Sequence, residues 1–413
     1  MDIMMTIAAV AAILMSAVSC DRIGGDPSAD NPYKSLDLST RSAEFVRTGN
    51  TFSMEFLSRI DADAEKDYII SPLSMQFLLG MLLDGARGTT AEEICSVLGY
   101  GKEETDAVNE YCLTMLKQLP TLDKKTKLSI ASAIFVDDGW PLLKSYKDAV
   151  GMYYHAEVEN LDFANGPASL RRINGWCSDN TNGLVPKVLD EVDPDMLAYL
   201  LNAIYFKSQW KEKFPKSATA DEKFTFADGS TGKVRMMKLA WKSFSYTEND
   251  LFQAVRLPYG NGAFSMTVLL PRSGHGTSEI PQYLKRTGVD ALMRNMFHCD
   301  VDLWLPRFET KYHVNLNEIL SAMGMPSAFN GKTADFKAMS DYALCLSFVQ
   351  QDAVIKVDEE GTEAAAVSAA GMMKATSVGP GEKVVFHADH PFIYLITENS
   401  TGAVLFAGRY GSK

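Results

Sequence analysis

The first half of the chain carries apolar residues at helical spacing. In AEFVRTGNTFSMEFLSRI they recur roughly every three or four positions, which predicts an amphipathic helix. In SPLSMQFLLGMLLDGA, Ser71 precedes a proline and an apolar body, a pattern typical of a helix start. TTAEEICSVLGY offers Thr89 or Thr90 as an N-cap and Gly99 as a C-terminal stop. The first half is therefore predicted to be mainly helical.

The second half changes to short strand patterns. FSMTVLLP, VDLWLPRF and AVIKVDEE are rich in β-forming residues, and some of them alternate. FIYLITENSTGAVLFAGRY predicts two strands around a polar turn at Asn399–Gly402. Because the helical and strand patterns are segregated, they favour an α+β fold with large antiparallel sheets. No second linker or fixed repeat follows Glu44, so residues 44–413 are predicted to form one domain.

A long small-residue segment, VDEEGTEAAAVSAAGMMKATSVGPGEK, interrupts the strand patterns. Alanine content and a Thr362 cap would suit a helix, and a flexible exposed loop is a second interpretation. The third interpretation is a strand that enters an existing sheet, with Gly361 as its hinge. One face of that strand would hold only Thr362, Ala364, Ala366, Ser368, Ala370 and Met372. Such a face could slide between existing strands without overpacking the core.

Insertion of this segment would release a large amount of free energy. A central strand of about twelve residues, at roughly 0.5–1.5 kcal/mol net per hydrogen bond, gives on the order of 10 kcal/mol. This is comparable to the stability of a whole domain. The third interpretation therefore implies a metastable protein that is held until its loop is cut.

The N-terminal residues differ from the rest. An apolar, small-residue run ends at Cys20 and is shorter than a typical membrane span, so residues 1–19 are predicted to be a signal peptide. Ala17, Val18 and Ser19 before Cys20 resemble a bacterial lipoprotein cleavage site, with Cys20 as the lipidated residue; a plain signal peptide cut nearby is the alternative. Residues 20–43 are polar and are predicted to be a tether. We expect an exported lipoprotein on the cell envelope, or otherwise a secreted, extracellular protein.

Composition and net charge argue against some classes of partner and of fold. The 413 residues are 46% hydrophobic and 22% charged, as in ordinary soluble domains, and the net charge of −12 argues against nucleic acid. The six cysteines are scattered without CxxC spacing, so we expect no dense disulfide framework and mostly buried thiols.

Signatures of ordinary catalysis are missing from the sequence. It has no GxSxG, P-loop or HExxH motif, and GNG at 260–262 is interpreted as a turn. His387 and His390 lack an evident third ligand, so they are interpreted as a polar strand entry. We expect no enzymatic activity, no metal and no cofactor.

Several segments, in order along the chain, resemble the serpin family. VDEEGTEAAAVSAA looks like the serpin proximal hinge, and YIISPLSMQFLLGMLLDGARGTTAEEI looks like the helix B–C region. LLNAIYFKSQWKEKF is similar to the family's NAxYFKGxW segment, with Ser208 where glycine is usual. VRLPYGNGAFSMTVLLP, LWLPRFETKYHVNLNEILSAMGMPSAF and DHPFIYLITENSTGAVLFAGR also match, so the resemblance covers about residues 44–411. It implies a serpin fold of three β-sheets, eight or nine helices and an exposed reactive-centre loop.

The resemblance also implies a mechanism. Serpins act as suicide substrates: a serine protease cuts the loop and forms an acyl-enzyme, and the loop then inserts into the main sheet and distorts the protease. Non-inhibitory serpins tend to have bulky residues, charged residues or proline in the hinge. Here the hinge is small throughout, so an inhibitor is predicted. The alternative is a non-inhibitory serpin that acts as a binding or structural protein.

Site residues follow from the family motifs. The resemblance implies a hinge of Glu359, Gly361, Thr362, Glu363, Ala364, Ala365 and Ala366. It implies a breach of Trp210, Arg307 and Glu359, and a polar shutter of Ser71, Ser74, Asn202 and Gln351. Gln351 occupies the position of the family's shutter histidine. Glutamine hydrogen-bonds but does not ionise, which argues against pH-sensitive opening there.

The reactive bond has two candidate positions. The family's usual spacing from Glu359 gives Ala375–Thr376, which suits elastase-like or subtilisin-like proteases. Lys374–Ala375 suits trypsin-like proteases and is slightly favoured, because Lys374 is the only charged specificity determinant near the bond. The expected partners are serine proteases, with cysteine proteases as a second class. We expect a monomer that contacts a membrane only through the lipid anchor.

Overall fold

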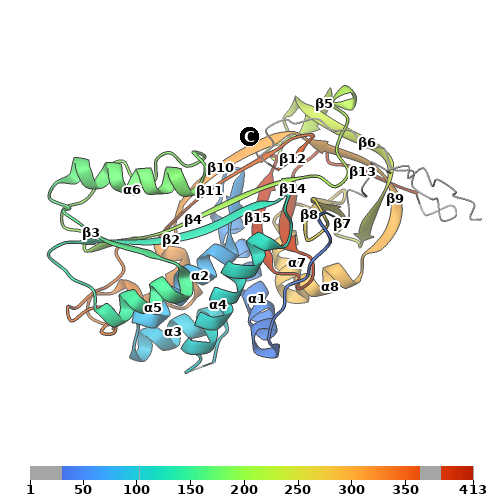
Figure 1. Cartoon of the computed structure of the whole chain (residues 1–413). Coiled ribbons are helices and arrows are strands. Elements are labelled where there is room, and N and C mark those ends of the chain that lie inside the picture. The colour runs from blue at the N-terminus through green and yellow to red at the C-terminus, as the bar shows by residue number, and fades with distance from the viewer. Residues whose placement is uncertain (1–29, 102, 363–382, 413) are drawn as a thin grey trace, which may run out of the picture.

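A computed structural model describes residues 30–101, 103–362 and 383–412 (Figure 1). Within these ranges nine α-helices accompany two sheets, which confirms the α+β class. The helices are α1 (Thr40–Asp63), α2 (Pro72–Gly85), α3 (Gly88–Leu98), α4 (Thr105–Gln118), α5 (Lys144–Tyr154), α6 (Gly166–Asn180), α7 (Glu279–Thr287), α8 (Val289–Arg294) and α9 (Asn317–Met323). Short 3-10 turns are η1 (Leu119–Thr121), η2 (Lys216–Ala218) and η3 (Pro326–Phe329).

The six-stranded sheet contains the segment of main interest. Its order is β10 (Phe308–Asn315), β11 (Gln350–Val357), β12 (Gly361–Thr362), β4 (Ala198–Gln209), β2 (Lys127–Asp137) and β3 (Glu157–Leu161). The two-residue strand β12 is antiparallel to both neighbours: Thr362 lies opposite Val357 on β11 and Ser208 on β4. The first residues of the small-residue segment therefore already lie between two longer strands.

The nine-stranded sheet runs β1 (Tyr68–Ile70), β15 (Val404–Tyr410), β14 (Phe392–Glu398), β8 (Phe264–Pro271), β7 (Phe252–Pro258), β6 (Thr231–Glu248), β9 (Phe297–Pro306) and β13 (Lys383–His387), and β5 (Ala220–Thr225) pairs with β6. The family resemblance implied three sheets. The 18-residue strand β6 pairs with β9 and, at its end, with β7, so two of these sheets form one hydrogen-bonded path. The strand pair predicted around Asn399–Gly402 is confirmed as β14 and β15.

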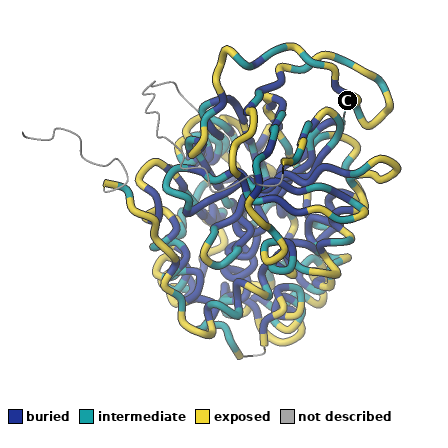
Figure 2. The backbone as a smooth tube through the Cα atoms, turned by 90° about the vertical axis from the view of Figure 1, so that its right-hand side faces the viewer, coloured by how far each residue is buried: buried dark blue, intermediate teal, exposed yellow. Residues whose placement is uncertain are grey.

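Helix α2 lies at the centre of the core. All of its residues except Asp84 are buried, because it packs beneath β4 and against β15, while α6 lies over the other face of the six-stranded sheet (Figure 1). Buried chain runs through the strands and the helix faces beneath them (Figure 2). The almost wholly apolar sequence of α2 is explained by this enclosed position.

The start of α3 differs from the prediction, whereas its end agrees with it. Helix α3 begins at Gly88 with Arg87 as an N-cap residue that makes no side-chain bond, so neither Thr89 nor Thr90 caps it. The Thr90 hydroxyl instead accepts a hydrogen bond from the Asp335 amide, at 3.0 Å. The predicted C-terminal stop at Gly99 is confirmed, with the glycine in the left-handed conformation.

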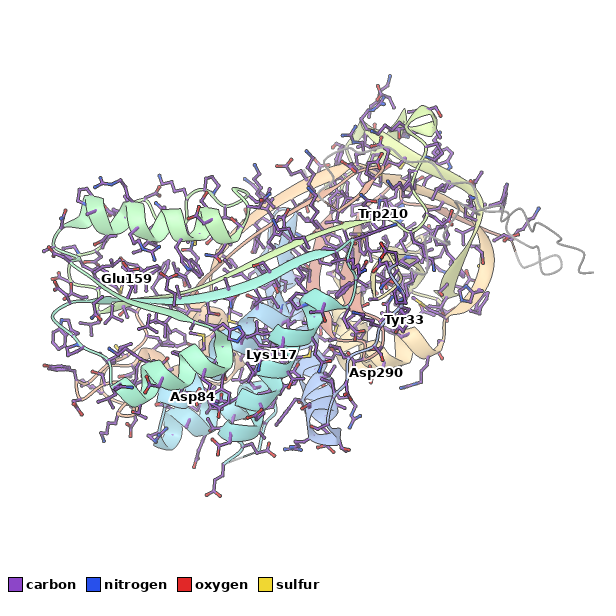
Figure 3. All side chains as sticks on the ribbon, in the orientation of Figure 1. Tyr33, Asp84, Lys117, Glu159, Trp210 and Asp290 are labelled. Atoms are coloured by element: carbon purple, nitrogen blue, oxygen red, sulfur yellow. The ribbon has the colours of Figure 1, made fainter. Side chains whose placement is uncertain are left out.

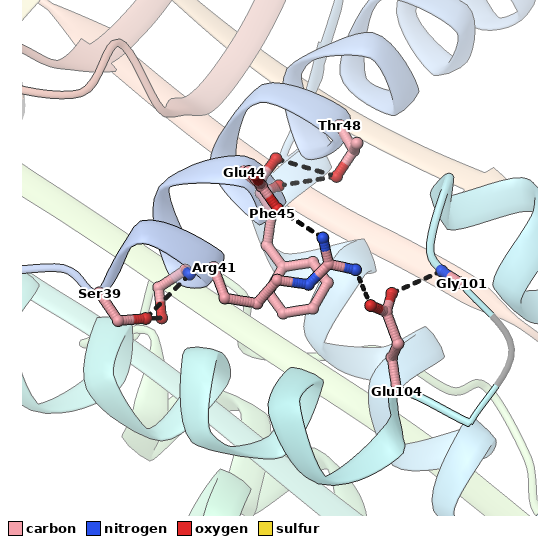
Figure 4. Close-up of polar contacts among 8 residues, drawn as sticks. Ser39, Arg41, Glu44, Phe45, Thr48, Gly101 and Glu104 are labelled. Carbon is pink, nitrogen blue, oxygen red and sulfur yellow. Dashed lines mark hydrogen bonds and ion pairs between the residues drawn. The ribbon is translucent and has the colours of Figure 1, made fainter.

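The folded body extends N-terminal of residue 44. Helix α1 begins at Thr40, and the Ser39 hydroxyl caps it by accepting from the Ser42 amide. Arg41 pairs with Glu44 and with Glu104 of the loop before α4 (Figure 4). The last residues of the predicted tether are therefore part of the packed structure.

None of the described cysteines forms a disulfide bond. Cys95, Cys112, Cys177 and Cys299 are buried, and Cys345 is partly buried. Burial raises the pKa of the Cys177 thiol to about 12 and that of Cys112 further. Among the described helices, none is long and apolar enough to cross a membrane.

Candidate functional site

A tight turn brings the chain from β11 into β12. The Asp358 carboxylate accepts from the backbone amides of Glu360, at 2.9 Å, and Gly361, at 3.3 Å. A Cβ atom on Gly361 would lie 2.0 Å from the Ser208 carbonyl oxygen. Only glycine fits this approach of two backbones, which explains the glycine that the sequence analysis assigned to a hinge.

Thr362 is enclosed where β12 ends. It is 1% exposed, and its hydroxyl lies 2.6 Å from the Tyr259 hydroxyl. Burial raises the pKa of Tyr259, so its hydroxyl stays protonated and able to hydrogen-bond. Ser208 and Val357, on either side of Thr362, are also buried. Thr362 thus marks the face of the small-residue segment that would point into the core.

Trp210 lies directly beside the turn. Its indole N–H donates to the Asp358 carbonyl at 2.8 Å, and its amide donates to the Glu360 carbonyl at 2.8 Å. Its ring stacks on Tyr259, with centroids 4.4 Å apart and an interplanar angle of 11°. The tryptophan therefore supports both the turn and the tyrosine that contacts Thr362.

Two carboxylates of the turn pair with basic side chains. Glu359, 5% exposed, lies 3.5 Å from the Arg307 Nε atom and accepts from the Thr219 hydroxyl at 2.8 Å. Glu360 accepts from Lys213 at 2.7 Å, and this hydrogen bond lowers the pKa of Glu360. We call Asp358–Thr362, with Trp210, Tyr259 and Arg307, the hinge site. The structure thus brings together Glu359, Arg307 and Trp210, which the resemblance grouped as a breach.

The four predicted shutter residues also meet, and we keep the name shutter for them. The Gln351 side chain from β11 makes two bonds to the Ser71 backbone: its oxygen accepts from the amide at 2.8 Å and its nitrogen donates to the carbonyl at 3.0 Å. Asn202 from β4 accepts from the Ser74 hydroxyl and donates to Ser132 at 3.0 Å. The N-terminus of α2 therefore ties together β11 and β4, the two strands between which β12 ends.

Other predicted residues lie outside the described residues. These are Cys20 and the 1–19 segment, the hinge residues Glu363, Ala364, Ala365 and Ala366, and the bond residues Lys374, Ala375 and Thr376. The reactive-centre loop expected to be exposed also lies there.

Sequence reasoning missed several partners of the hinge site. Tyr259 and Lys213 lie in segments that resemble the family but were assigned no role, and Thr219 carried no signal of its own. An aromatic residue just before a Gly-Asn-Gly turn is the one feature that marks Tyr259 in the sequence. That turn is confirmed, with both Gly260 and Gly262 at positive φ.

The two histidines that could have suggested a metal do not converge. His387 contacts Asp302 at 3.0 Å and stacks on Trp304, whereas His390 contacts the Pro271 carbonyl at 2.9 Å. Within the part of the chain that the structure describes, no group of three His, Cys, Asp or Glu side chains is arranged to hold a metal.

Comparison with known proteins decides the family. The family model described as serpin (serine protease inhibitor) matches residues 47–412. The chain belongs to the serpin family. Among serpins, it is 33% identical to human Serpin B3 over 383 residues, which are 87% of this chain and 97% of that one. Against Iripin-8 of Ixodes ricinus the identity is 32% over 383 residues, covering 90% and 94% of the two chains.

Solved serpin structures share the whole fold. The thermophilic serpin tengpin in its native state matches with a TM-score of 0.81 and 29% identity, over 92% of this chain and 96% of that chain. Thyroxine-binding globulin in complex with thyroxine matches with a TM-score of 0.79 and 25% identity, over 90% and 100%. Serpins are mostly protease inhibitors, and the globulin is an example of a non-inhibitory member.

Proposed function

We propose that this serpin inhibits serine proteases as a suicide substrate. The observation that carries the proposal is β12: Gly361 and Thr362 already pair with β4, and Thr362 also pairs with β11. Strand insertion therefore needs no new starting point, because the first residues of the incoming strand are in register. After cleavage, the rest of the segment would follow them.

The register of β12 supports an insertion path through the shutter. Because Thr362 lies opposite Ser208 and Val357, six further residues in the same antiparallel register bring Ser368 opposite Asn202 and Gln351. Ser368 would point to the same face as Thr362, since side chains alternate along a strand. A hydroxyl would then reach the amides of the shutter, where a bulky apolar side chain would leave them unpaired.

Insertion would also trap the protease. A new central strand would gain on the order of 10 kcal/mol from its ladder, and this gain would drive the movement of the attached acyl-enzyme. Whether a given protease is trapped or released depends on the rate of insertion relative to hydrolysis of the acyl bond. The small residues in the segment favour fast insertion.

The reactive bond and the location are further parts of the proposal. We propose Lys374–Ala375 as the bond for trypsin-like targets, with Ala375–Thr376 for elastase-like or subtilisin-like targets. We also propose export of a monomer, with Cys20 as the lipid anchor on the cell envelope. The apolar run that ends at Cys20 supports this location.

The proposal is tested by incubating the protein with trypsin, elastase and subtilisin. We expect complexes that survive SDS, and a released C-terminal fragment that begins at Ala375 or Thr376 by mass spectrometry. The cleaved protein should melt at a higher temperature than the intact protein. If no serine or cysteine protease gives a covalent complex, a non-inhibitory binding or structural role is favoured. If the cleaved form melts no higher, insertion does not occur.

A further inference from the structure

A buried carboxylate lies close to the hinge site but takes no part in the contacts described above. Asp123, between η1 and β2, is 1% exposed. One oxygen accepts from the Asn31 amide nitrogen at 2.7 Å and from the Lys125 backbone at 2.9 Å. The other accepts from the Thr126 hydroxyl at 2.8 Å and the Asn261 backbone at 3.3 Å. All four donors are neutral, and none of the ion pairs among the described residues involves this carboxylate.

Two of these donors, Thr126 and Asn261, connect Asp123 to the side chains around Thr362. The Thr126 hydroxyl also lies 2.6 Å from the Ser208 hydroxyl, and Ser208 is opposite Thr362 on β4. Asn261 follows Tyr259 by two residues, and the Tyr259 hydroxyl contacts Thr362 at 2.6 Å. The carboxylate thus links two residues, Ser208 and Tyr259, that border the same threonine.

Gly260 shows how closely the carboxylate packs on the turn after Tyr259. A Cβ atom at this position would lie 1.8 Å from an Asp123 oxygen, and the residue has φ +43°. Any side chain there would displace the carboxylate or the turn. The turn is therefore shaped around Asp123, and its position depends on that side chain.

The segment before α1 completes this arrangement. The Asn31 side chain also accepts from the Lys124 backbone at 3.0 Å, and the Pro32 carbonyl accepts from the Asn261 side chain at 2.9 Å. Further along, Leu36 is buried and its amide donates to the Ser400 hydroxyl at 3.0 Å. Figure 3 shows Tyr33, in this segment, in the same half of the molecule as Trp210. The N-terminal segment therefore joins the Asp123 loop to the Tyr259 turn.

We propose that Asn31 and Asp123 are positioning residues for the hinge. They hold Ser208 and Tyr259 where both border Thr362, and so keep β12 between β11 and β4 before cleavage. This inference rests on the proposed inhibitory function. It assigns a role in loop insertion to the residues just before the first helix, which lie outside the segments that resemble the family.

The test uses Asn31→Ala in the full mature chain. With the hinge held less firmly, insertion starts later and more acyl-enzyme is hydrolysed, so we expect at least a twofold rise in the molar ratio of serpin consumed per trypsin inhibited. SDS-stable complexes should still form. Tryptophan emission should shift to the red, because Trp210 bonds the turn that leads into β12; the same comparison in a Trp210→Phe background identifies its contribution.

A matched control separates positioning from general stability. Asn249, in the turn between β6 and β7 of the nine-stranded sheet, is half-buried like Asn31. Its side chain likewise makes two hydrogen bonds, which its oxygen accepts from the backbone amides of Leu251 and Phe252, away from the hinge site. Asn249→Ala should lower the melting temperature without changing the inhibition ratio or the Trp210 emission. If Asn31→Ala behaves like this control, the positioning role is refuted.

A second variant tests the route through Thr362. Thr362→Val removes the hydroxyl that contacts Tyr259, so Asn31→Ala should raise the inhibition ratio little further in that background; full additivity would overturn the proposal. If the wild-type protein forms no covalent complex, the proposed function fails separately. The positioning role is then decided by the fluorescence emission of Trp210 alone. A red shift in Asn31→Ala supports the role, and an unchanged spectrum refutes it.

Discussion

The hinge site and the shutter border the same pair of strands, but different chemistry holds each of them. At the hinge site, Glu359 and Glu360 pair with arginine and lysine, and stacked aromatic rings support the turn. At the shutter, the bonds described above join only amides, hydroxyls and backbone groups. The first region therefore depends on charge, and the second on the geometry of neutral hydrogen bonds.

This difference indicates what each region can respond to. Ion pairs near the surface weaken as the salt concentration rises, whereas buried hydrogen bonds between uncharged groups are little affected. None of the four shutter residues has a side chain that titrates near neutral pH. Opening at the shutter should therefore not depend on pH, whereas contacts at the hinge site should respond to ionic strength and to charge substitutions.

The largest expected effect is at the hinge. Thr362→Arg would place an unpaired charge at a position that is 1% exposed, at a cost of several kcal/mol. We expect the protease to cleave this variant without being trapped, so that SDS-stable complexes disappear. Thr362→Ser keeps the hydroxyl and should still form them. A detergent-stable complex with the arginine variant would contradict the insertion mechanism.

A smaller effect is expected at the shutter. Asn202→Ala removes the bonds to Ser74 and Ser132, and we expect the intact protein to lose about 1–3 kcal/mol of unfolding free energy. Denaturant unfolding monitored by circular dichroism measures this loss. Asn295→Ala, at an exposed position, is the matched control and should change little. An equally stable Asn202→Ala protein would show that the shutter bonds do not hold the strands together.

The stability of the folded protein should depend on pH through Asp84, near the C-terminal end of α2, and not through the shutter at the N-terminal end of this helix. Burial raises the pKa of Asp84 from 3.8 to about 6, and one of its oxygens has no partner among the described atoms. Because the native state holds this proton more tightly than the unfolded chain, stability falls as pH rises from about 4 to 6, by about 3 kcal/mol in total.

The substitution Asp84→Asn tests this assignment. The variant should lack the fall in stability between pH 4 and 6, and so should be more stable than the wild type at pH 7. Urea unfolding at a series of pH values measures the difference. If the variant keeps the wild-type slope, another group controls the pH dependence.

The smallest effect is expected at a charged contact of the hinge site. Lys213→Ala removes a hydrogen-bonded partner of Glu360, and we expect a loss below about 1 kcal/mol because the lysine is one-third exposed. High salt should remove most of the difference between variant and wild type in unfolding experiments. A difference that persists in 1 M salt would mean that the contact acts through packing and not through charge.

Much of the fold could be predicted from the sequence because local patterns match local structure. The Ser71 cap, the Gly99 stop and the strand pair at Asn399–Gly402 each depend on neighbouring residues. The shutter could be predicted only through the family resemblance. Its residues are up to 280 positions apart, and nothing in their own spacing brings them together.

Other features depend on tertiary contacts that the sequence does not display. Thr90 does not cap α3 because its hydroxyl is engaged by the Asp335 amide. The tether boundary was drawn from composition, yet Asn31 and Leu36 find partners at Asp123 and Ser400. Polar composition predicted a linker there, and long-range hydrogen bonds fixed the segment instead.

The cysteines outside disulfide bonds have a consequence for the proposed insertion of the loop. No disulfide bond connects the described strands, so separation of β11 from β4 in the six-stranded sheet would break no disulfide. The buried thiols of Cys112 and Cys177 stay protonated at neutral pH, which leaves them poor nucleophiles toward oxidants. The same conformational change should therefore proceed equally well in reducing and in oxidising surroundings.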